Sequence, residues 1–364
     1  MAISDTNNKW TIGWGITARC DLNCPFCYSQ EVRGSANTET CATVGESFLR
    51  QNASRIKAIN FGTGESFLSP NFPQIIQLCS NILPGVPIAV TTNGAAVDLE
   101  KKQLSSIVEC LSECDISLDF GDRDTFDRWR GKSGAWVRAM ESLKLFSDTQ
   151  VQTSLVLIGT AQTLTEENMN SLFEISERYG TAFRINFYMP TTGNMSFAPT
   201  RDQVYASLSL LLEWASSVRT SDRLFQSLLN QNGENGAKEV FSCRILPDGV
   251  YSPSTYLITK PWLTSFRITD RPLMALLDTE PFIRYRTPVI PEHCLSCVLL
   301  DSCQGGSIER RWLYCGTMDE PDPYCPHLDR GIGRLAADVV SDEWDGPEVH
   351  LGYLPTLIAK GPSK

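Results

Sequence analysis

A repeated alternation of strand and helix is the feature of this sequence that most restricts its fold. Short runs rich in β-branched and aromatic residues alternate with segments whose apolar residues recur at helical spacing, in six units over about 210 residues. The expected strands are 10–17, 57–61, 87–92, 115–120, 150–158 and 181–189, and the expected helices are 70–83, 98–111, 133–146, 165–180 and 200–218. The pattern predicts an α/β fold with a mostly parallel sheet, open or partly closed into a barrel. Functional residues are expected at the carboxyl ends of the strands.

Three cysteines lie in the loop after the first expected strand. Cys20, Cys24 and Cys27 have the spacing C-x3-C-x2-C. Zinc usually takes four ligands, and no histidine occurs before His293. A four-iron cluster held by three thiolates would instead leave one iron free for an external ligand. The loop therefore predicts an iron–sulfur cluster with an open position, and a zinc knuckle or unrelated core cysteines are the alternatives.

Composition excludes several other classes of function. A net charge of −10 argues against nucleic-acid binding, and no apolar run approaches the roughly 20 residues of a membrane span. The first ten residues, MAISDTNNKW, have neither the basic nor the apolar region of a signal peptide. We therefore expect a cytoplasmic protein whose thirteen cysteines bind clusters or metals, or are buried thiols, rather than forming disulfides.

The cysteine loop resembles that of the radical S-adenosylmethionine (SAM) enzymes, whose signature has the same spacing. The resemblance covers about residues 10–190 and implies a partial (β/α)6 barrel of the radical SAM type. It implies that the open iron of a [4Fe-4S] cluster binds SAM. Reduction, with flavodoxin or ferredoxin as electron donor, would then cleave SAM to a 5′-deoxyadenosyl radical that abstracts a hydrogen atom from the substrate.

Later segments resemble the SAM-binding segments of that family, in the same order. FGTGES (61–66) resembles a Gly-Gly-Glu segment with Thr63 inserted, and TTNG (91–94), SLDF (117–120) and RWRGKSGAW (128–136) resemble later strand ends. Glycines let backbone carbonyls approach an ammonium group, and a carboxylate adds complementary charge. The resemblance assigns SAM binding to Phe26, Gly62, Gly64, Glu65, Asn93, Ser117, Asp119 and Arg130, with Lys132 as an alternative to Arg130. No catalytic base can be named.

A second cysteine group lies in an irregular, Pro-rich region after residue 243. Cys294, Cys297, Cys303 and Cys325 have the spacing C-x2-C-x5-C followed by a later cysteine, which predicts a four-thiolate site. Structural zinc is the alternative. The segments CQGGS and DPYCPH resemble the SPASM extension of radical SAM enzymes that modify peptides, which implies an auxiliary [4Fe-4S] cluster here. Such a cluster would transfer electrons or staple an irregular region.

A further auxiliary cluster that is usual in SPASM extensions has an incomplete ligand set here. Ser254 and Ser307 stand where two cysteines are expected, and serine rarely replaces a thiolate on iron. Cys243 and Cys315 are left over, either as structural thiols or as parts of a degenerate site. We therefore expect one auxiliary cluster, not two.

Four regions follow from these motifs. We expect a radical SAM partial barrel over 1–218, a polar linker over 219–242, a SPASM-like domain over 243–335 and a C-terminal tail over 336–364. No internal repeat occurs beyond the strand–helix units.

The resemblance implies a ribosomally made precursor peptide as substrate. Only nineteen residues precede Cys20, so we expect a separate leader-recognition protein to deliver the peptide. This organisation resembles the two-component spliceases, which excise tyramine and leave an α-keto-β-amino amide. Cross-linking through C–C or thioether bonds, epimerisation and sulfatase-type Cys/Ser oxidation stay open as alternatives. Two other classes of protein are alternatives. A non-catalytic iron–sulfur electron carrier would leave the three-thiolate site unexplained, and a zinc-binding interaction module would contain zinc and would not turn over SAM.

Overall fold

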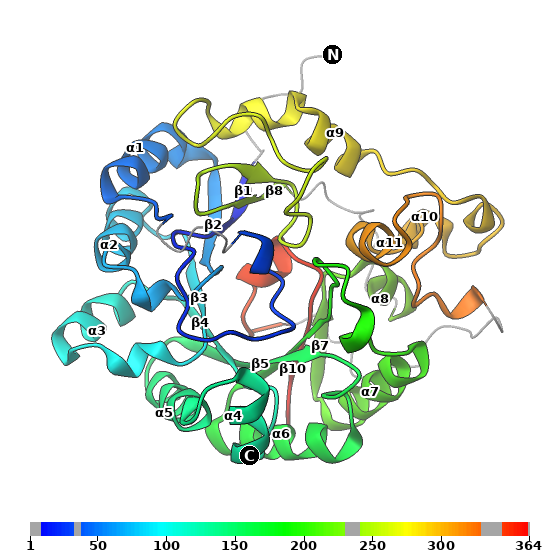
Figure 1. The fold of residues 1–364 in the computed structure, drawn as a ribbon, viewed down its shortest axis with the longest axis horizontal. Helices are drawn as coiled ribbons and strands as arrows, with labels where there is room; N and C mark the ends of the chain where they lie inside the picture. Colours follow the sequence, from blue (N-terminus) through cyan, green and yellow to red (C-terminus); the bar gives the residue numbers. More distant parts are fainter. Residues whose placement is uncertain (1–8, 33–37, 230–240, 329–343, 363–364) are drawn as a thin grey trace.

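A curved sheet of ten strands forms the centre of the molecule (Figure 1). The computed structural model describes residues 9–32, 38–229, 241–328 and 344–362. Six strands are parallel and adjacent in chain order: β1 (Trp10–Trp14), β2 (Ile56–Phe61), β3 (Ile88–Thr92), β4 (Glu113–Ser117), β5 (Gln152–Gly159) and β6 (Ala182–Phe187). The predicted α/β fold with a mostly parallel, partly closed sheet is therefore confirmed.

Helices surround the sheet and cover its outer face (Figure 1). They are α1 (Ala42–Asn52), α2 (Phe72–Ile82), α3 (Lys101–Val108), α4 (Arg123–Arg130), α5 (Ala135–Ser147), α6 (Glu166–Tyr179), α7 (Arg201–Trp214) and α8 (Arg223–Leu228). In α6, the Thr165 side chain accepts a hydrogen bond from the Asn168 backbone N–H, and Gly180 ends the helix in the left-handed conformation. Local start and stop signals therefore set the bounds of α6. Two helices, α1 and α4, were not predicted from the sequence.

Four further strands in the described ranges extend the sheet beyond the six predicted ones. β8 (Phe241–Ile245) pairs in parallel with β1, and β9 (Tyr251–Ser252) pairs with β8. At the other edge, β10 (Leu357–Lys360) lies antiparallel between β6 and β7 (Ser217–Thr220). Parts of the expected linker, extension and tail therefore share one sheet with the barrel strands. The three boundaries between the four expected regions stay a prediction, and the boundary at residues 335 and 336 lies outside the described residues.

The C-terminal segment enters the interior of the barrel before it reaches β10. The backbone N–H of Val349 donates to the Glu113 carboxylate at 3.0 Å, and the His350 Nε2 atom lies 2.7 Å from Asp115 Oδ2. Both carboxylates are buried on β4. Because a buried carboxylate requires hydrogen-bond or charge partners, these contacts fix the segment against β4.

The cysteine-rich region forms an irregular extension beside the barrel, drawn in yellow and orange in Figure 1. Its helices are α9 (Glu280–Arg286), α10 (Leu300–Cys303) and α11 (Ile308–Cys315). The fully buried Arg310 of α11 contacts Asp222 at 2.5 Å and Asp322 at 2.6 Å. Since Asp222 caps α8, this arginine joins the extension to the barrel.

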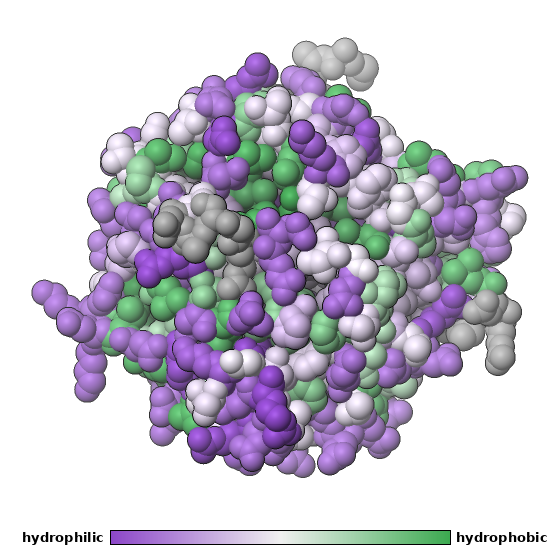
Figure 2. All heavy atoms as spheres, viewed as in Figure 1, coloured by the Kyte–Doolittle hydropathy of each residue, from purple (hydrophilic) through white to green (hydrophobic). Residues whose placement is uncertain are grey.

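The outer surface mixes hydrophilic and hydrophobic residues, with hydrophilic ones prominent over the helices along the lower edge of Figure 2. None of the helices in the described ranges combines the length and apolarity needed to cross a membrane.

Candidate active site

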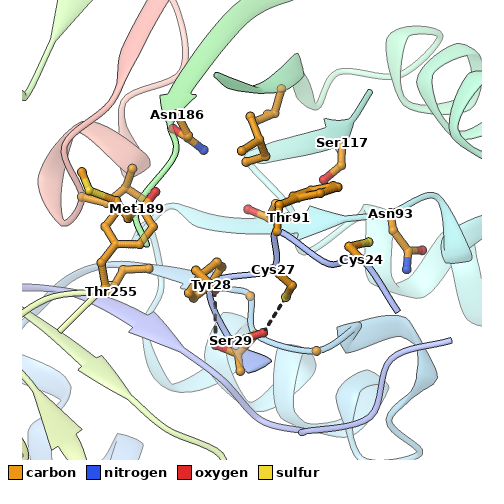
Figure 3. A pocket seen from close by; sticks show the side chains of 18 of the residues that line it. Cys24, Cys27, Tyr28, Ser29, Thr91, Asn93, Ser117, Asn186, Met189 and Thr255 are labelled. Carbon is orange, nitrogen blue, oxygen red and sulfur yellow. Dashed lines mark hydrogen bonds between the residues drawn. The ribbon is translucent and has the colours of Figure 1, made fainter. Parts of the chain in front are cut away.

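A cavity with about 1070 Å³ of empty space, its open mouth included, lies at the carboxyl ends of the parallel strands. The three cysteines of the first loop line it together with Phe26, Gly62, Gly64, Glu65, Asn93, Ser117 and Arg130. In the view of Figure 3, Cys24 and Asn93 lie on one side, Met189 and Thr255 lie on the other, and Tyr28 lies between them. The structure therefore brings together every predicted barrel-site residue except Asp119.

Each cysteine of the first loop contacts a polar side chain from its surroundings. Asn93 Nδ2 donates to Cys20 Sγ at 3.7 Å, Arg130 Nη1 donates to Cys24 Sγ at 3.7 Å, and Ser29 Oγ is 3.1 Å from Cys27 Sγ. Within the described ranges, no three His, Cys, Asp or Glu side chains are grouped to hold a single metal ion. A four-iron cluster does not require its ligands to converge on one ion, because each thiolate binds a separate iron.

The glycine-rich segment after β2 is held in a conformation that requires its sequence. Gly64 has a φ of +61°, and a Cβ atom there would lie 2.4 Å from the Arg19 carbonyl oxygen. Thr63 also has a positive φ, of 81°, which is strained for a β-branched residue. The Thr63 that the sequence inserts into the pattern is therefore accommodated at the cost of local strain.

Glu65 ends this segment as a buried carboxylate. It accepts hydrogen bonds from the Asn93 backbone N–H at 2.7 Å and from Thr92 Oγ1 at 3.0 Å. Burial raises the pKa of Glu65 to about 7, although these hydrogen bonds oppose the shift. No Lys or Arg of the described residues forms an ion pair with this carboxylate, and a bound ammonium group would supply a cationic partner.

Asn93 and Lys132 are tied to the loop through Asp21. Asn93 Nδ2 donates to Asp21 Oδ1 at 3.0 Å, while Lys132 Nζ and Arg138 Nη1 each lie 2.5 Å from Asp21 Oδ2. Burial acts to raise the pKa of Asp21, but Lys132 and Arg138 hold it below its ordinary value. Lys132 is thus paired with this carboxylate and does not line the cavity.

Asp119 lies behind the cavity wall, not in it. Its carboxylate accepts from Trp129 Nε1 and from the Ile158 backbone N–H, both at 3.0 Å, and lies 2.7 Å from Arg130 Nη2. Arg130 in turn lies over the Phe26 ring, 5.2 Å from its centroid. Asp119 therefore positions Arg130, whereas Arg130 and Phe26 reach the cavity.

The opposite side of the cavity comes from segments that the sequence did not single out as site residues. Tyr28 follows the cysteine loop, Met189 follows β6, and Tyr256, Tyr353 and the rest of the wall come from the extension and the C-terminal segment. These residues are separated by up to about 325 positions and carry no spacing motif. Only the pairing of β8 and β10 with barrel strands reveals that they share one cavity.

The second cysteine group converges on a smaller hollow in the extension. Cys294, Cys297, Cys303 and Cys325 line a space of about 350 Å³ together with Leu224, Leu299 and Leu300. Burial raises the pKa of Cys303 to about 12 and also raises the pKa values of Cys294 and Cys325. The four cysteines that the spacing pattern singled out therefore line one hollow, together with Asp322 and His327.

The incomplete cluster site contains a buried carboxylate. Ser254 Oγ donates to Glu309 Oε1 at 2.6 Å, Tyr285 Oη donates to the same atom at 2.9 Å, and Ser307 Oγ donates to Glu309 Oε2 at 3.0 Å. The two serines that occupy expected cysteine positions thus meet on one side chain. Cys243 is buried on β8 and Cys315 is exposed at the end of α11.

Comparison with known families identifies the class of the chain. Residues 14–174 match the Radical SAM superfamily, a span that includes the cysteine loop and strands β2 to β5. This match, the parallel sheet and the loop geometry together identify residues 14–174 as a radical SAM domain. Membership implies SAM and a [4Fe-4S] cluster as cofactors.

Individual relatives differ in what they act on. The chain is 26% identical to Fe-coproporphyrin III synthase of Methanosarcina barkeri over 91% of both chains. It is 26% identical to the antilisterial bacteriocin subtilosin biosynthesis protein AlbA of Bacillus subtilis, over 45% of this chain and 35% of AlbA. Streptococcus suis SuiB bound to its precursor peptide SuiA superposes with a TM-score of 0.66 at 18% identity, covering 88% of this chain and 76% of SuiB. The structural likeness extends beyond the barrel.

Proposed function

We propose that the chain is a radical SAM enzyme that modifies a ribosomally made precursor peptide. The main observation behind this proposal is one cavity. Cys20, Cys24 and Cys27 line it together with a neutral wall from the extension and the C-terminal segment. Relatives that include a bacteriocin biosynthesis protein, and the likeness to SuiB in complex with its precursor peptide, support a peptide substrate.

The residues in the cavity fit a cluster and SAM. Three thiols face one space, Gly64 leaves no room for a side chain, and Glu65 is a buried carboxylate suited to an ammonium group. The Oδ1 atom of Asn93 is buried without a hydrogen-bond partner among the described residues, as expected for a group that meets a ligand. When bound, the cluster and SAM would supply a 5′-deoxyadenosyl radical.

The chain's own residues would hold and orient these groups. Cys20, Cys24 and Cys27 would bind three irons, and Glu65 would accept a hydrogen bond from the SAM ammonium. Gly62, Gly64, Asn93 and Ser117 would contact SAM, Phe26 would pack beside it, and Arg130 would pair with negative charge at the loop while Asp119 holds Arg130 in place. Burial of the far wall would keep water from a reactive intermediate.

An auxiliary [4Fe-4S] cluster on Cys294, Cys297, Cys303 and Cys325 is part of the proposal. Four thiols lining one hollow of about 350 Å³ support it. A site with all four positions filled would transfer electrons or stabilise the extension and would not bind substrate. We propose that the extension is SPASM-like because its four cysteines would hold this auxiliary cluster.

Tyramine excision, which would leave an α-keto-β-amino amide, is the specific reaction we propose. The favouring observation is a neutral, tyrosine-rich wall formed by Tyr28, Tyr256 and Tyr353. Peptide cross-linking, epimerisation and Cys/Ser oxidation are the alternatives. Delivery by a separate recognition protein, and reduction by flavodoxin or ferredoxin in the cytoplasm, belong to the same proposal.

A tetrapyrrole substrate is the second candidate, because the Fe-coproporphyrin III synthase relative matches 91% of both chains. A coproporphyrin is a large tetracarboxylate, and binding it requires several cationic side chains. Arg130 is the one Lys or Arg among the described residues that line the cavity, and it contacts Cys24. This shortage of positive charge favours the peptide.

Anaerobic incubation with SAM, dithionite and each small peptide encoded beside the gene tests the proposal. We expect 5′-deoxyadenosine together with a mass change in one peptide. The tyramine reaction predicts a mass loss equal to the excised tyramine unit. Release of 5′-deoxyadenosine with no peptide changed, together with turnover of an iron coproporphyrin, would favour the second candidate instead.

A further inference from the structure

The wall opposite the cysteine loop contains a hydroxyl group that the fold does not use. Thr255 lines the cavity, and 3% of its surface is exposed. Its Oγ1 atom has no hydrogen-bond partner within the described part of the chain. Figure 3 shows Thr255 on the same side as Met189, across from Cys24. A buried hydroxyl without a partner is unfavourable, so a ligand that bonds to it would relieve a defect in the free protein.

The loop that carries Thr255 is rigidly held. Ser254 Oγ donates to Glu309 and accepts from the Tyr256 backbone N–H at 3.3 Å. Ser252 Oγ donates to the Ser254 carbonyl at 2.9 Å and to the Leu257 carbonyl at 2.8 Å. Because the residues on both sides of Thr255 are held by these hydrogen bonds, the backbone at Thr255 has a defined position beside the cavity.

The residues that line the cavity around Thr255 are largely apolar, and the buried Arg244, which does not line the cavity, donates from behind them to Tyr28 Oη at 3.3 Å. Met189, Tyr256, Tyr353 and Leu354 form one buried cluster against which Tyr28 packs. Tyr28 and Tyr256 meet edge to face, with ring centroids 5.5 Å apart. The two charged residues among those that line the cavity, Glu65 and Arg130, belong to the side of the cysteine loop.

His350 is a further ionisable residue that lines the cavity, but its side chain already has a charged partner. Its Nε2 atom lies 2.7 Å from Asp115 Oδ2, and the Asp115 carboxylate also lies 3.1 Å from Arg184 Nη1. These buried partners balance one another within the barrel. A charged substrate group would therefore find no unpaired counter-ion among the described residues that line this side; the buried Arg244 does not line it and donates to Tyr28 Oη and to the Gly62 carbonyl.

We propose that Thr255 is a substrate-binding residue of a neutral subsite, and that the subsite takes an uncharged, mainly apolar side chain carrying one hydroxyl or amide group. This inference rests on the proposed peptide-modifying function and specifies the class of residue that is modified. The apolar cluster contributes affinity, and the Thr255 hydroxyl discriminates between a side chain that bears the polar group and one that lacks it.

The test pairs changes in the enzyme with changes in the peptide. The probe is the neighbouring precursor peptide whose mass changes with the wild-type holoenzyme, and a second peptide lacks the polar group of the modified residue (Tyr→Phe if that residue is Tyr). Thr255→Val keeps the shape of the side chain and removes the hydroxyl, whereas Thr255→Ser keeps the hydroxyl. Thr264→Val is a matched control, because Thr264 donates to the Phe266 carbonyl and does not line the cavity.

We expect Thr255→Val to lower kcat/KM for the natural peptide by about tenfold, the effect of one lost hydrogen bond in a buried site. Thr255→Ser restores most of it. The peptide without the polar group is processed equally by wild type and Thr255→Val, so the two changes are not additive. Thr264→Val lowers thermal stability without altering the preference between the peptides. 5′-Deoxyadenosine formed without peptide stays unchanged in Thr264→Val, which lies outside the cavity.

Equal losses with both peptides, or no loss in Thr255→Val, would overturn the inference. Efficient processing of a peptide with Lys or Glu at the modified position would overturn the neutral subsite. If the wild-type enzyme cleaves SAM but changes no peptide, the proposed function itself fails and this inference fails with it. SAM cleavage measured without peptide separates that outcome from a failure at Thr255 alone.

Discussion

The two cysteine sites differ in how each is enclosed. Cys20, Cys24 and Cys27 open onto about 1070 Å³ of empty space, and each contacts a polar side chain. Cys294, Cys297, Cys303 and Cys325 share about 350 Å³ with leucines. Three cysteines in a large, open cavity suit a site that binds a further molecule, whereas four cysteines around a small hollow suit a closed one.

At each site, the number of cysteines is consistent with the size of the space around them. The barrel site lies where parallel strands end and where SAM-type chemistry needs room, and the extension site lies in a region with little regular structure of its own. We infer that the barrel site performs chemistry and that the extension site supports it.

Loss of a barrel cysteine should have the largest effect. Cys24→Ser removes one of three ligands, so we expect no measurable 5′-deoxyadenosine from SAM and dithionite under anaerobic conditions. Cys297→Ser, its matched counterpart in the extension, should still cleave SAM. The two variants are compared by chromatography of the nucleoside product after both are shown to be folded by circular dichroism. Equal loss in both would mean that the sites are not functionally distinct.

The next largest effect is expected on the free energy of unfolding, when the ion pairs that join the barrel to the extension are broken. Arg310→Met leaves the buried carboxylates of Asp222 and Asp322 without their cation, which we expect to lower the free energy of unfolding by about 3–5 kcal/mol. Denaturant unfolding of the cluster-free protein measures it. Arg284→Met is the control, because its ion pair with Glu280 is on the surface. A loss of less than about 1 kcal/mol, typical of an exposed pair, would contradict the account.

Removing the Glu65 charge should weaken SAM binding at the open site by about tenfold or more, as expected for one charge-assisted hydrogen bond. The pKa of about 7 gives a pH dependence. Glu65 must lose its proton to meet the ammonium, so SAM affinity should fall up to about tenfold per pH unit below 7. In the SAM-free protein the raised pKa stabilises the fold most below the ordinary value of 4.5, and this contribution is lost as the pH rises through 7.

Calorimetric titration with SAM between pH 6 and 8 measures this dependence. Glu65→Gln should show both the weaker binding and a flat pH profile. A pH-dependent profile in Glu65→Gln would assign the titration to another group.

A smaller effect is expected at the buried Glu309 carboxylate, which accepts hydrogen bonds from three hydroxyl groups. Glu309→Gln weakens hydrogen bonds from Ser254, Ser307 and Tyr285, and we expect a loss of about 1–3 kcal/mol in unfolding free energy with no change in bound iron. Iron analysis and thermal unfolding measure the two quantities. A fall in iron by about one cluster in Glu309→Gln would contradict the absence of metal from this site.

Sequence reasoning succeeded where the information is local. The six parallel strands, the helix stop at Gly180 and the cysteine spacings are each encoded within a few residues. It failed for the far wall of the cavity, because Thr255 and Tyr353 reach it only through strand pairing of β8 and β10 at opposite edges of the sheet. We expected Asp119 in the cavity because the segment SLDF (117–120) resembles a SAM-binding strand end, but Asp119 bonds to Trp129 and Arg130 behind the wall.

The most direct test of the two-site account is a count of iron, sulfide and zinc per chain after anaerobic reconstitution. It is made on the wild type and on the triple variant Cys20/Cys24/Cys27→Ala. The account predicts about eight irons in the wild type and about four in the variant, since the extension site keeps its own four-iron cluster. About four irons falling to none, with one zinc retained in both, would contradict it and make the extension site structural zinc.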